Sequence, residues 1–203
     1  MPWDFSTGFG SDGRPVGFFS DDDATLYVEA IYRRRGGVIV EIGSWMGRSL
    51  SYAIPACKFF GGKIYAIDTW GEWTISAPDN APLANSINET LKNSGSDYFY
   101  NCFIDNLKQI TGSDCVIPVR KSSVEASKDF SEYSVDLVYI DGSHDYDSVK
   151  EDINTWWPKI KMGGYIGGHD FHPGITGVYK AVQEFVGTRP FEYYNTSWLF
   201  RKV

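Results

Sequence analysis

The sequence predicts an open α/β sheet, mostly parallel, with helices wound over both faces. Short apolar runs rich in β-branched residues alternate with longer segments of helical periodicity, which is typical of strand–helix–strand units. The run Val38–Ile42 leads into a Gly-x-x-x-Gly turn and a helix-compatible segment, as at the ligand-binding edge of such sheets. Two apolar runs around Asn195 predict a terminal hairpin, so we expect seven strands with an antiparallel edge.

The elements are expected in regular order. Ser20 is a helix N-cap followed by three aspartates, which predicts a helix that continues through Arg35. Short apolar runs predict strands at 38–42, 63–67, 115–119, 135–140 and 164–168. Longer amphipathic segments predict helices at 48–60, 98–110, 124–130, 148–160 and 177–186. The closing hairpin is predicted from residues 190–194 and 198–202.

Two segments depart from this alternation of strands and helices. Residues 1–19 are rich in glycine, aspartate and serine and are expected to form an extended N-terminal arm. Residues 70–97 are longer than an ordinary connection, which favours a lid or substrate loop. The chain has 203 residues and no internal repeat, so we expect one domain, 1–203.

Composition argues against several classes of function. A formal net charge of −7 argues against a nucleic-acid binder. No run approaches the ~20 apolar residues of a membrane span, and the N-terminus lacks the pattern of a secretory signal. Three cysteines without Cys-x-x-Cys spacing favour a reducing compartment, so we expect a cytoplasmic protein. The aromatic arm and the edge hairpin leave a homodimer open as the assembly.

The glycine turn indicates which ligand the edge accepts. A side chain at Gly43 or Gly47 would obstruct a ligand lying across the backbone or strain the turn. The turn lacks both the Gly-x-Gly-x-x-Gly spacing of dinucleotide sites and the Lys-Ser/Thr ending of a phosphate loop, so neither pyrophosphate nor triphosphate is expected. Glu41, just before the turn, instead suits a ligand with a cationic end.

Polar and aromatic residues follow the neighbouring strands. Asp68 ends the second strand, where an acid can bind a ribose diol; a helix cap or a surface acid is the alternative. Ser122 and Ser123 follow the third strand, where they either contact an adenine edge or cap the next helix. Three tryptophans could wall a pocket for a purine or an apolar acceptor: Trp45, Trp70 and Trp73.

All three histidines follow the fourth and fifth predicted strands. Asp141 and His144 come after the fourth strand, and His169, Asp170 and His172 come after the fifth. Asp141, His169 and Asp170 could bind a divalent cation, and carboxylate-rich ligation favours Mg²⁺, Mn²⁺ or Ca²⁺ over zinc. His144 could act as a general base, because an unperturbed pKa of about 6.5 suits deprotonation of a hydroxyl. The alternatives are a loop histidine bonded to backbone and a cluster that holds no metal.

Four motifs together resemble a known family: Val-Glu-Ile-Gly-Ser-x-x-Gly-Arg-Ser, Ala-Ile-Asp-Thr-Trp, Tyr-Ile-Asp-Gly-Ser-His-x-Tyr and Met-Gly-Gly-x-x-x-Gly-His-Asp. They are similar to those of class I S-adenosylmethionine-dependent methyltransferases, in particular small-molecule O-methyltransferases of the macrolide-sugar, cephalosporin-biosynthesis and caffeoyl-CoA type. The resemblance covers roughly residues 20–190. It implies a Rossmann-like, doubly wound domain that transfers a methyl group to a hydroxyl of a small-molecule acceptor.

The resemblance also implies roles for individual residues. Asp141 and His144 would be catalytic, with His144 as the base. Asp141, His169 and Asp170 would hold Mg²⁺. The cofactor-binding residues would be Glu41, Gly43, Ser44, Gly47, Ser49, Asp68, Thr69, Trp70, Ser122, Ser123 and Asp141.

Two positions depart from the family pattern. His169 stands where most metal-dependent members have an acid or an amide, and Ser122 replaces the usual acid after the third strand. A non-catalytic cofactor-binding module and an N-methyltransferase are therefore alternatives to an O-methyltransferase.

Overall fold

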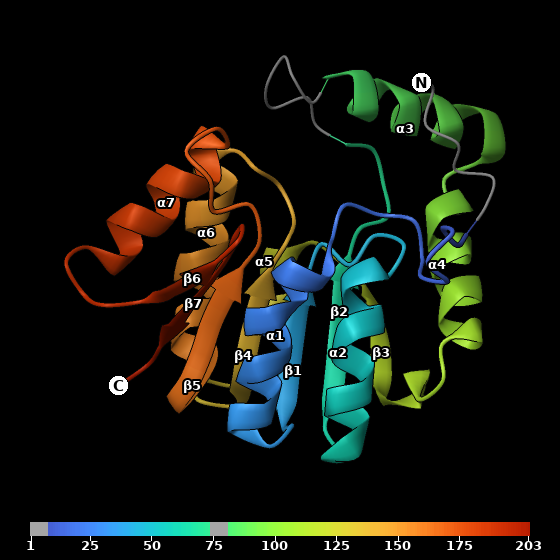
Figure 1. Cartoon of the computed structure of the whole chain (residues 1–203). Helices are drawn as coiled ribbons and strands as arrows, with labels where there is room; N and C mark the ends of the chain where they lie inside the picture. Colours follow the sequence, from blue (N-terminus) through green and yellow to red (C-terminus); the bar gives the residue numbers. More distant parts are fainter. Residues whose placement is uncertain (1–7, 74–80) are drawn as a thin grey trace.

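The computed structural model describes residues 8–73 and 81–203. Within these residues, seven strands form one sheet in the order β3-β2-β1-β4-β5-β7-β6 (Figure 1). Neighbours from β3 to β5 pair in parallel, whereas β7 pairs antiparallel with β5 and β6. The strands are β1 Val38–Ile42, β2 Lys63–Asp68, β3 Val116–Arg120, β4 Val135–Ile140, β5 Ile160–Gly168, β6 Glu192–Tyr194 and β7 Ser197–Arg201. The predicted fold class is confirmed.

Helices cover both faces of this sheet. The first four contribute buried residues to one hydrophobic cluster, and the last three to a second cluster on the other face. Their bounds are α1 Asp21–Arg34, α2 Arg48–Phe59, α3 Ala81–Ser94, α4 Tyr98–Gln109, α5 Ser123–Ser127, α6 Tyr146–Trp156 and α7 Thr176–Val186. Among the described residues, none of the helices combines the length and apolarity needed to cross a bilayer.

The central strands are apolar because both of their faces are covered. β4 is buried at every position, and β1 is buried at every position after Val38. Parallel strands covered on both sides have nearly continuous apolar sequences. β1 and β4 are neighbours in the sheet. The chain leads from β1 to β2 on one side and from β4 to β5 on the other, so the two connections run in opposite directions. The carboxyl ends of β1 and β4 form the edge where this class of sheet binds ligands.

The described part of the N-terminal arm, residues 8–20, is fastened to the start of α2. Arg48 Nε donates to the carbonyl oxygen of Phe19 at 2.6 Å, and Arg48 Nη1 donates to that of Pro15 at 3.0 Å. The Arg14 guanidinium lies 3.7 Å from the centroid of the Tyr52 ring. This part of the arm therefore packs on its own chain instead of extending away from it.

The largest difference from the sequence prediction lies in the segment 70–97. Ala81–Ser94 forms α3, which lies above α4 in Figure 1, whereas residues 74–80 lie outside the described residues. Asn88 of α3 exchanges hydrogen bonds with the backbone of Trp73, at 2.9 and 3.0 Å. Only three residues of this helix are buried, at helical spacing: Ala84, Ile87 and Leu91.

Other predicted boundaries also differ: the helix predicted at 124–130 ends at Ser127, and the strand predicted at 190–194 begins at Glu192. Two further differences have a clear physical reason. α6 ends at Trp156 and does not continue through Ile160, because Pro158 cannot continue an α-helix. β5 begins at Ile160 rather than at Gly164, since Val135 pairs with Ile160 across a register shift.

Candidate active site

The turn after β1 packs directly on the loop after β4. Gly43 has a φ of +88°, and a Cβ at this position would overlap the carbonyl oxygen of Asp141. The amide of Gly43 donates to the carbonyl oxygen of Ile67 at 2.8 Å. Gly47, with a φ of +85°, is the N-cap of α2. The backbone itself therefore requires both glycines, and it joins the ends of β1, β2 and β4.

Glu41 and Ser44 present buried polar atoms beneath this turn. Within the described part of the chain, neither carboxyl oxygen of Glu41 nor the hydroxyl of Ser44 forms a hydrogen bond of ordinary geometry. Burial raises the pKa of Glu41 to about 8, and the charge of Asp141 adds to the rise. The nearby Ser44 and Ser49 hydroxyls offset only part of it. Buried polar groups without partners are uncommon, and these lie where the sequence predicts a cationic ligand.

Asp68, at the end of β2, forms hydrogen bonds with the loop after β1 and with the loop after β2. Its Oδ2 accepts the amide of Trp45 at 2.8 Å, and its Oδ1 accepts the amide of Trp70 at 2.7 Å. Burial raises the pKa of Asp68, and these hydrogen bonds oppose the rise. Each carboxylate oxygen has two lone pairs, so Asp68 can still accept from a ligand hydroxyl. The next residue, Thr69, is exposed, and its hydroxyl accepts the amide of Gly71 at 3.3 Å.

Trp70 lies in the core and does not face the open edge. Its indole Nε1 donates to the carbonyl oxygen of Trp45 at 2.6 Å, and its ring packs against Tyr100 and Phe103 of α4. The prediction that Trp70 flanks a bound base does not agree with this position, because α4 covers a ring that is only 2% exposed. Trp45 and Trp73 are partly exposed, with ring centroids 5.6 Å apart, and are the better candidates for a pocket wall.

Ser122 and Ser123 both have structural partners. Ser122 forms a capping box with Glu125 at the start of α5, and its hydroxyl donates to the Glu125 carboxylate at 3.0 Å. Ser123 Oγ accepts the indole Nε1 of Trp156 at 2.8 Å. The capping alternative is therefore observed for Ser122, and contact with an adenine edge stays a prediction for both serines.

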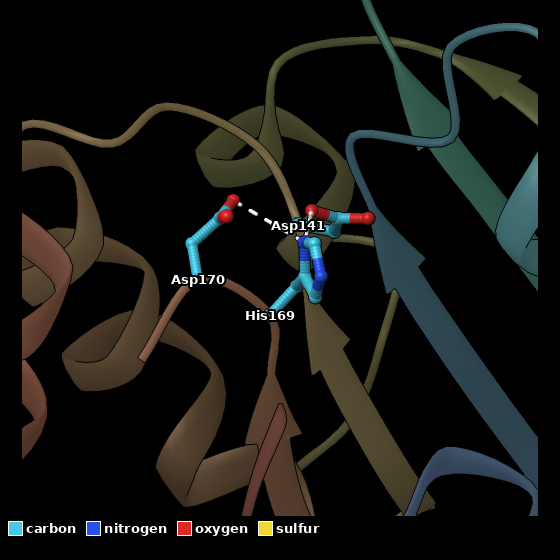
Figure 2. Close-up of side chains that lie close together, drawn as sticks. All are labelled: Asp141, His169 and Asp170. Carbon is cyan, nitrogen blue, oxygen red and sulfur yellow. Dashed lines mark ion pairs between the residues drawn. The ribbon is translucent and has the colours of Figure 1, made fainter. Parts of the chain in front are cut away.

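The structure brings Asp141, His169 and Asp170 together at the ends of β4 and β5 (Figure 2). His169 Nδ1 lies 3.3 Å from Asp141 Oδ1 and 3.3 Å from Asp170 Oδ2. One ligand atom from each residue lies within 4.8 Å of the others. His172 does not join this cluster: it is exposed, and its Nδ1 accepts the amide of Gly174 at 3.0 Å.

Carboxylates surround His169. Burial would lower the pKa of His169, but Asp141, Asp170 and Asp23 outweigh that effect and raise it to about 12. Burial also opposes ionisation of Asp170, yet its contacts with His144 and His169 hold its pKa well below the ordinary range. Without another cation, the imidazolium of His169 balances the acids around it.

The donor set of this cluster fits a divalent metal ion. Two carboxylates and one imidazole nitrogen already face one another within coordination range. A proton on Nδ1 of His169 would leave when a metal binds, because only a neutral imidazole is a ligand. The imidazole makes the set softer than an all-oxygen site.

His144 lies beside the cluster and is more open to solvent. Its Nε2 lies 2.9 Å from Asp170 Oδ2, and its side chain is 40% exposed. Burial lowers the pKa of His144, but Asp170 and Asp141 outweigh this effect, so the net direction is upward. An imidazole oriented by a carboxylate is the usual arrangement of a general base.

Asp23 belongs to this site and was missed in the sequence. The N-cap pattern around Ser20 indicates only a helix start, and the capping box between Ser20 and Asp23 confirms that start. The same carboxylate also faces the far side of His169, with 3.4 Å between Asp23 Oδ2 and His169 Nε2. No local pattern signals this contact, because it forms only when α1 packs against the end of β5.

Comparison with known proteins identifies the family. A sequence profile described as a methyltransferase domain matches residues 40–171, more than half of the 203 residues. The chain belongs to this methyltransferase family. It is also 28% identical, over 168 residues, to the uncharacterized protein y4gI of Sinorhizobium fredii. This match covers 80% of the chain but only 16% of that relative, which is much longer.

Solved methyltransferases share the fold. NovP, an O-methyltransferase, superposes with a TM-score of 0.64 and 13% identity over 93% of this chain and 84% of its own. CalS11, a TDP-rhamnose 3'-O-methyltransferase, has a TM-score of 0.56 and 17% identity over 87% and 77%. An S-adenosylmethionine-dependent O-methyltransferase of Thermotoga maritima has a TM-score of 0.58 and 15% identity over 91% and 65%. Similarity at these identities concerns the fold alone.

Proposed function

We propose that this methyltransferase-family chain transfers the methyl group of S-adenosylmethionine to a hydroxyl oxygen of a small-molecule acceptor, with His144 as general base. The observation that carries the proposal is the 2.9 Å contact between His144 Nε2 and Asp170 Oδ2 at the ligand edge. A carboxylate that holds one imidazole nitrogen leaves the other nitrogen to accept a proton. A module that only bound a cofactor would have no use for such a base.

Two acids and one hydroxyl support S-adenosylmethionine as the cofactor. Neither the buried carboxyl of Glu41 nor the hydroxyl of Ser44 forms a hydrogen bond of ordinary geometry within the described residues, and both suit the ammonium group of the methionine moiety. The remaining lone pairs of Asp68 suit the ribose hydroxyls. The other proposed cofactor contacts are Gly43, Gly47, Ser49, Thr69, Ser122, Ser123 and Asp141.

A divalent metal ion is proposed as the second component of the site. Asp141, His169 and Asp170 would hold it through one atom each. When bound, such an ion lowers the pKa of an acceptor hydroxyl and stabilises the resulting oxyanion. His144 lies next to Asp170, so it can remove the proton that the hydroxyl loses.

α3 is proposed to cover the acceptor. The helix is tied to the segment after β2 through Asn88 and Trp73, close to the partly exposed Trp45. Methyl transfer from a sulfonium to an oxygen anion neutralises charge, so exclusion of water favours it. A cover of this kind also commits the bound acceptor to reaction.

The proposal is tested by incubating the purified chain with S-adenosylmethionine and two acceptor panels, one of phenols, catechols and sugars and one of amines. Formation of S-adenosylhomocysteine is measured. His144→Ala should reduce kcat by about 10²-fold or more and leave S-adenosylhomocysteine binding unchanged in calorimetry. His172→Ala is the matched control, an exposed histidine outside the cluster, and should retain kcat. Binding without turnover on either panel would favour a non-catalytic module, and turnover on amines alone would favour an N-methyltransferase.

A further inference from the structure

The carboxylate of Asp23 is held rigidly from two directions. Its Oδ2 accepts the Ser20 amide at 3.0 Å and the Ser20 hydroxyl at 2.6 Å. Its Oδ1 accepts Asn195 Nδ2 at 2.6 Å and the Thr196 hydroxyl at 2.8 Å. The N-terminus of α1 and the β6–β7 turn thus fix this side chain, which is 5% exposed. A helix cap alone needs neither the burial nor the contacts from the hairpin turn.

The fixed carboxylate faces one nitrogen of His169. Asp23 Oδ2 lies 3.4 Å from Nε2 of His169. Among the described residues, Nε2 forms no hydrogen bond of ordinary geometry, although the residue is only 7% exposed. The Phe19 ring packs on the imidazole, with centroids 5.0 Å apart. The ring of His169 is therefore held between a carboxylate and an aromatic ring, and its orientation is set.

The other nitrogen faces the predicted ligands. His169 Nδ1 lies 3.3 Å from an oxygen of Asp141 and 3.3 Å from an oxygen of Asp170 (Figure 2). In metal sites, a histidine ligand usually donates its second N–H to a carboxylate, which fixes the tautomer and strengthens the bond to the metal. Asp23, His169 and the two aspartates lie in the same order: Nε2 faces the Asp23 carboxylate at 3.4 Å, and Nδ1 faces the site.

We infer that Asp23 is a positioning residue for a metal site in which His169 binds through Nδ1, and that this site prefers a divalent transition-metal ion such as Mn²⁺ to Mg²⁺. The inference rests on the metal ion of the proposed function, but it does not require that methyl transfer takes place. Imidazole is a good ligand for first-row transition ions, whereas Mg²⁺ prefers oxygen ligands and keeps its waters. One histidine with two carboxylates therefore shifts the preference away from Mg²⁺.

Binding of Mn²⁺ alone is measured first, on the full chain stripped with chelator. Electron paramagnetic resonance follows the loss of the free Mn²⁺ signal, and spin-echo modulation detects nitrogen bound to the ion. We expect one Mn²⁺ per chain with an imidazole nitrogen coupling. Competing Mg²⁺ should be needed in about tenfold or greater excess to displace half of it.

Two variants separate positioning from helix capping. Asp23→Asn keeps an acceptor oxygen for the cap, turns its amide nitrogen toward Asn195 and Thr196, and removes the charge that faces His169. It should weaken Mn²⁺ binding by about 10- to 100-fold. Glu125→Gln is the matched control, because Glu125 forms the same kind of capping box with Ser122 but is exposed. This control should bind Mn²⁺ as the parent does. His169→Asp should abolish the nitrogen coupling and reduce the preference over Mg²⁺.

Several results would overturn the inference: no bound Mn²⁺, no nitrogen coupling in the parent, displacement by equimolar Mg²⁺, or equal Mn²⁺ affinity of Asp23→Asn and Glu125→Gln. Methyl transfer that persists in excess chelator, in a protein that binds no Mn²⁺, would end this inference and the metal part of the proposed function but leave transfer with His144 as base intact. The expected Mn²⁺ binding without methyl transfer to any acceptor would support this inference and count against the proposed function.

Discussion

Asp170 Oδ2 and His144 Nε2 lie 2.9 Å apart and join the end of β5 to the loop after β4. The same oxygen lies 3.3 Å from His169 Nδ1, so one carboxylate faces both His144 and His169. The backbone of Asp170 has a φ of +62°, which is unusual for a residue with a side chain. Strained residues of this kind gather at functional sites, where the surrounding structure holds them.

His144 should titrate above its ordinary pKa of about 6.5. Asp170 and Asp141 stabilise its charged form more than burial disfavours it, so the pKa is raised. Replacement of the Asp170 carboxylate in Asp170→Asn removes the main partner, and the pKa should fall. Two-dimensional NMR of the imidazole resonances in chelator-treated samples measures both values. A pKa for His144 at or below 6.5 in the parent would contradict this account.

Glu41→Gln should stabilise the fold at neutral and mildly alkaline pH. The folded chain keeps the Glu41 proton up to about pH 8, whereas the unfolded chain releases it near the ordinary value of 4.5. Between these values the unfolded state binds fewer protons, so the free energy of unfolding falls as pH rises. Gln does not ionise, so the free energy of unfolding of the variant does not fall with pH for this reason. We expect a Tm several degrees above that of the parent at pH 8, given about 2–4 °C per kcal/mol for a chain of this size. The difference in Tm between Glu41→Gln and the parent should become smaller towards pH 5.

The same residue should link cofactor binding to pH. An ammonium group placed next to Glu41 favours the carboxylate, so binding of S-adenosylhomocysteine should release a proton below pH 8. Calorimetry in buffers of different ionisation enthalpy counts that proton, and affinity should rise between pH 6 and pH 8. Glu41→Gln should bind more weakly and show no such dependence from this site. If the parent and Glu41→Gln released the same number of protons on binding, Glu41 would not be a contact of the cofactor.

Gly43→Ala should be far more damaging than Gly61→Ala. Both glycines have positive φ, +88° and +67°, but a Cβ on Gly61 meets nothing within 4 Å. Alanine at Gly61 should therefore lose about 1–2 kcal/mol, the cost of the left-handed backbone. Alanine at Gly43 must also displace the backbone of Asp141, so we expect a loss above about 4 kcal/mol. Urea denaturation compares the two, and equal losses would mean that the contact between the loops is not required.

Asn88→Ala should affect the acceptor rather than the cofactor. The variant loses both hydrogen bonds to the backbone of Trp73 and so loosens α3. A higher acceptor KM with unchanged affinity for S-adenosylhomocysteine is expected if α3 covers the acceptor. Asn93→Ala, at an exposed position of the same helix, serves as the control. Unchanged acceptor kinetics in Asn88→Ala would rule out the covering role.

The sheet and the position of the cluster could be predicted from the sequence for a simple reason. β1 and β4 are covered on both faces, so apart from Glu41 and Asp136 their residues are apolar, and each strand leads into polar residues. Since carboxyl ends of parallel strands share one edge, Asp141 and His169 were expected to meet, and they do.

What could not be predicted depends on packing between distant segments. α3 buries three residues at helical spacing, but the proline, asparagines and serines of its sequence are also typical of a loop. Trp70 follows a strand end, where a ring can turn outward or inward, and α4 decides the outcome by packing Tyr100 and Phe103 against it. The position of Asp23 in the sequence is fully explained by its role in the helix cap. Its contact with His169 could not be predicted, because it depends on the packing of α1 against β5.

The β6–β7 hairpin and the N-terminal arm also limit how short an expressed fragment of this domain can be. A fragment limited to residues 40–171, the span of the family profile, would lack α1, α7, β6 and β7. Tyr165–Gly168 of β5 would then lose its partner strand, and an open strand edge of this kind recruits other chains and aggregates. In long homologues, the excision limits should therefore follow the contacts of residues 8–203 rather than the limits of sequence similarity.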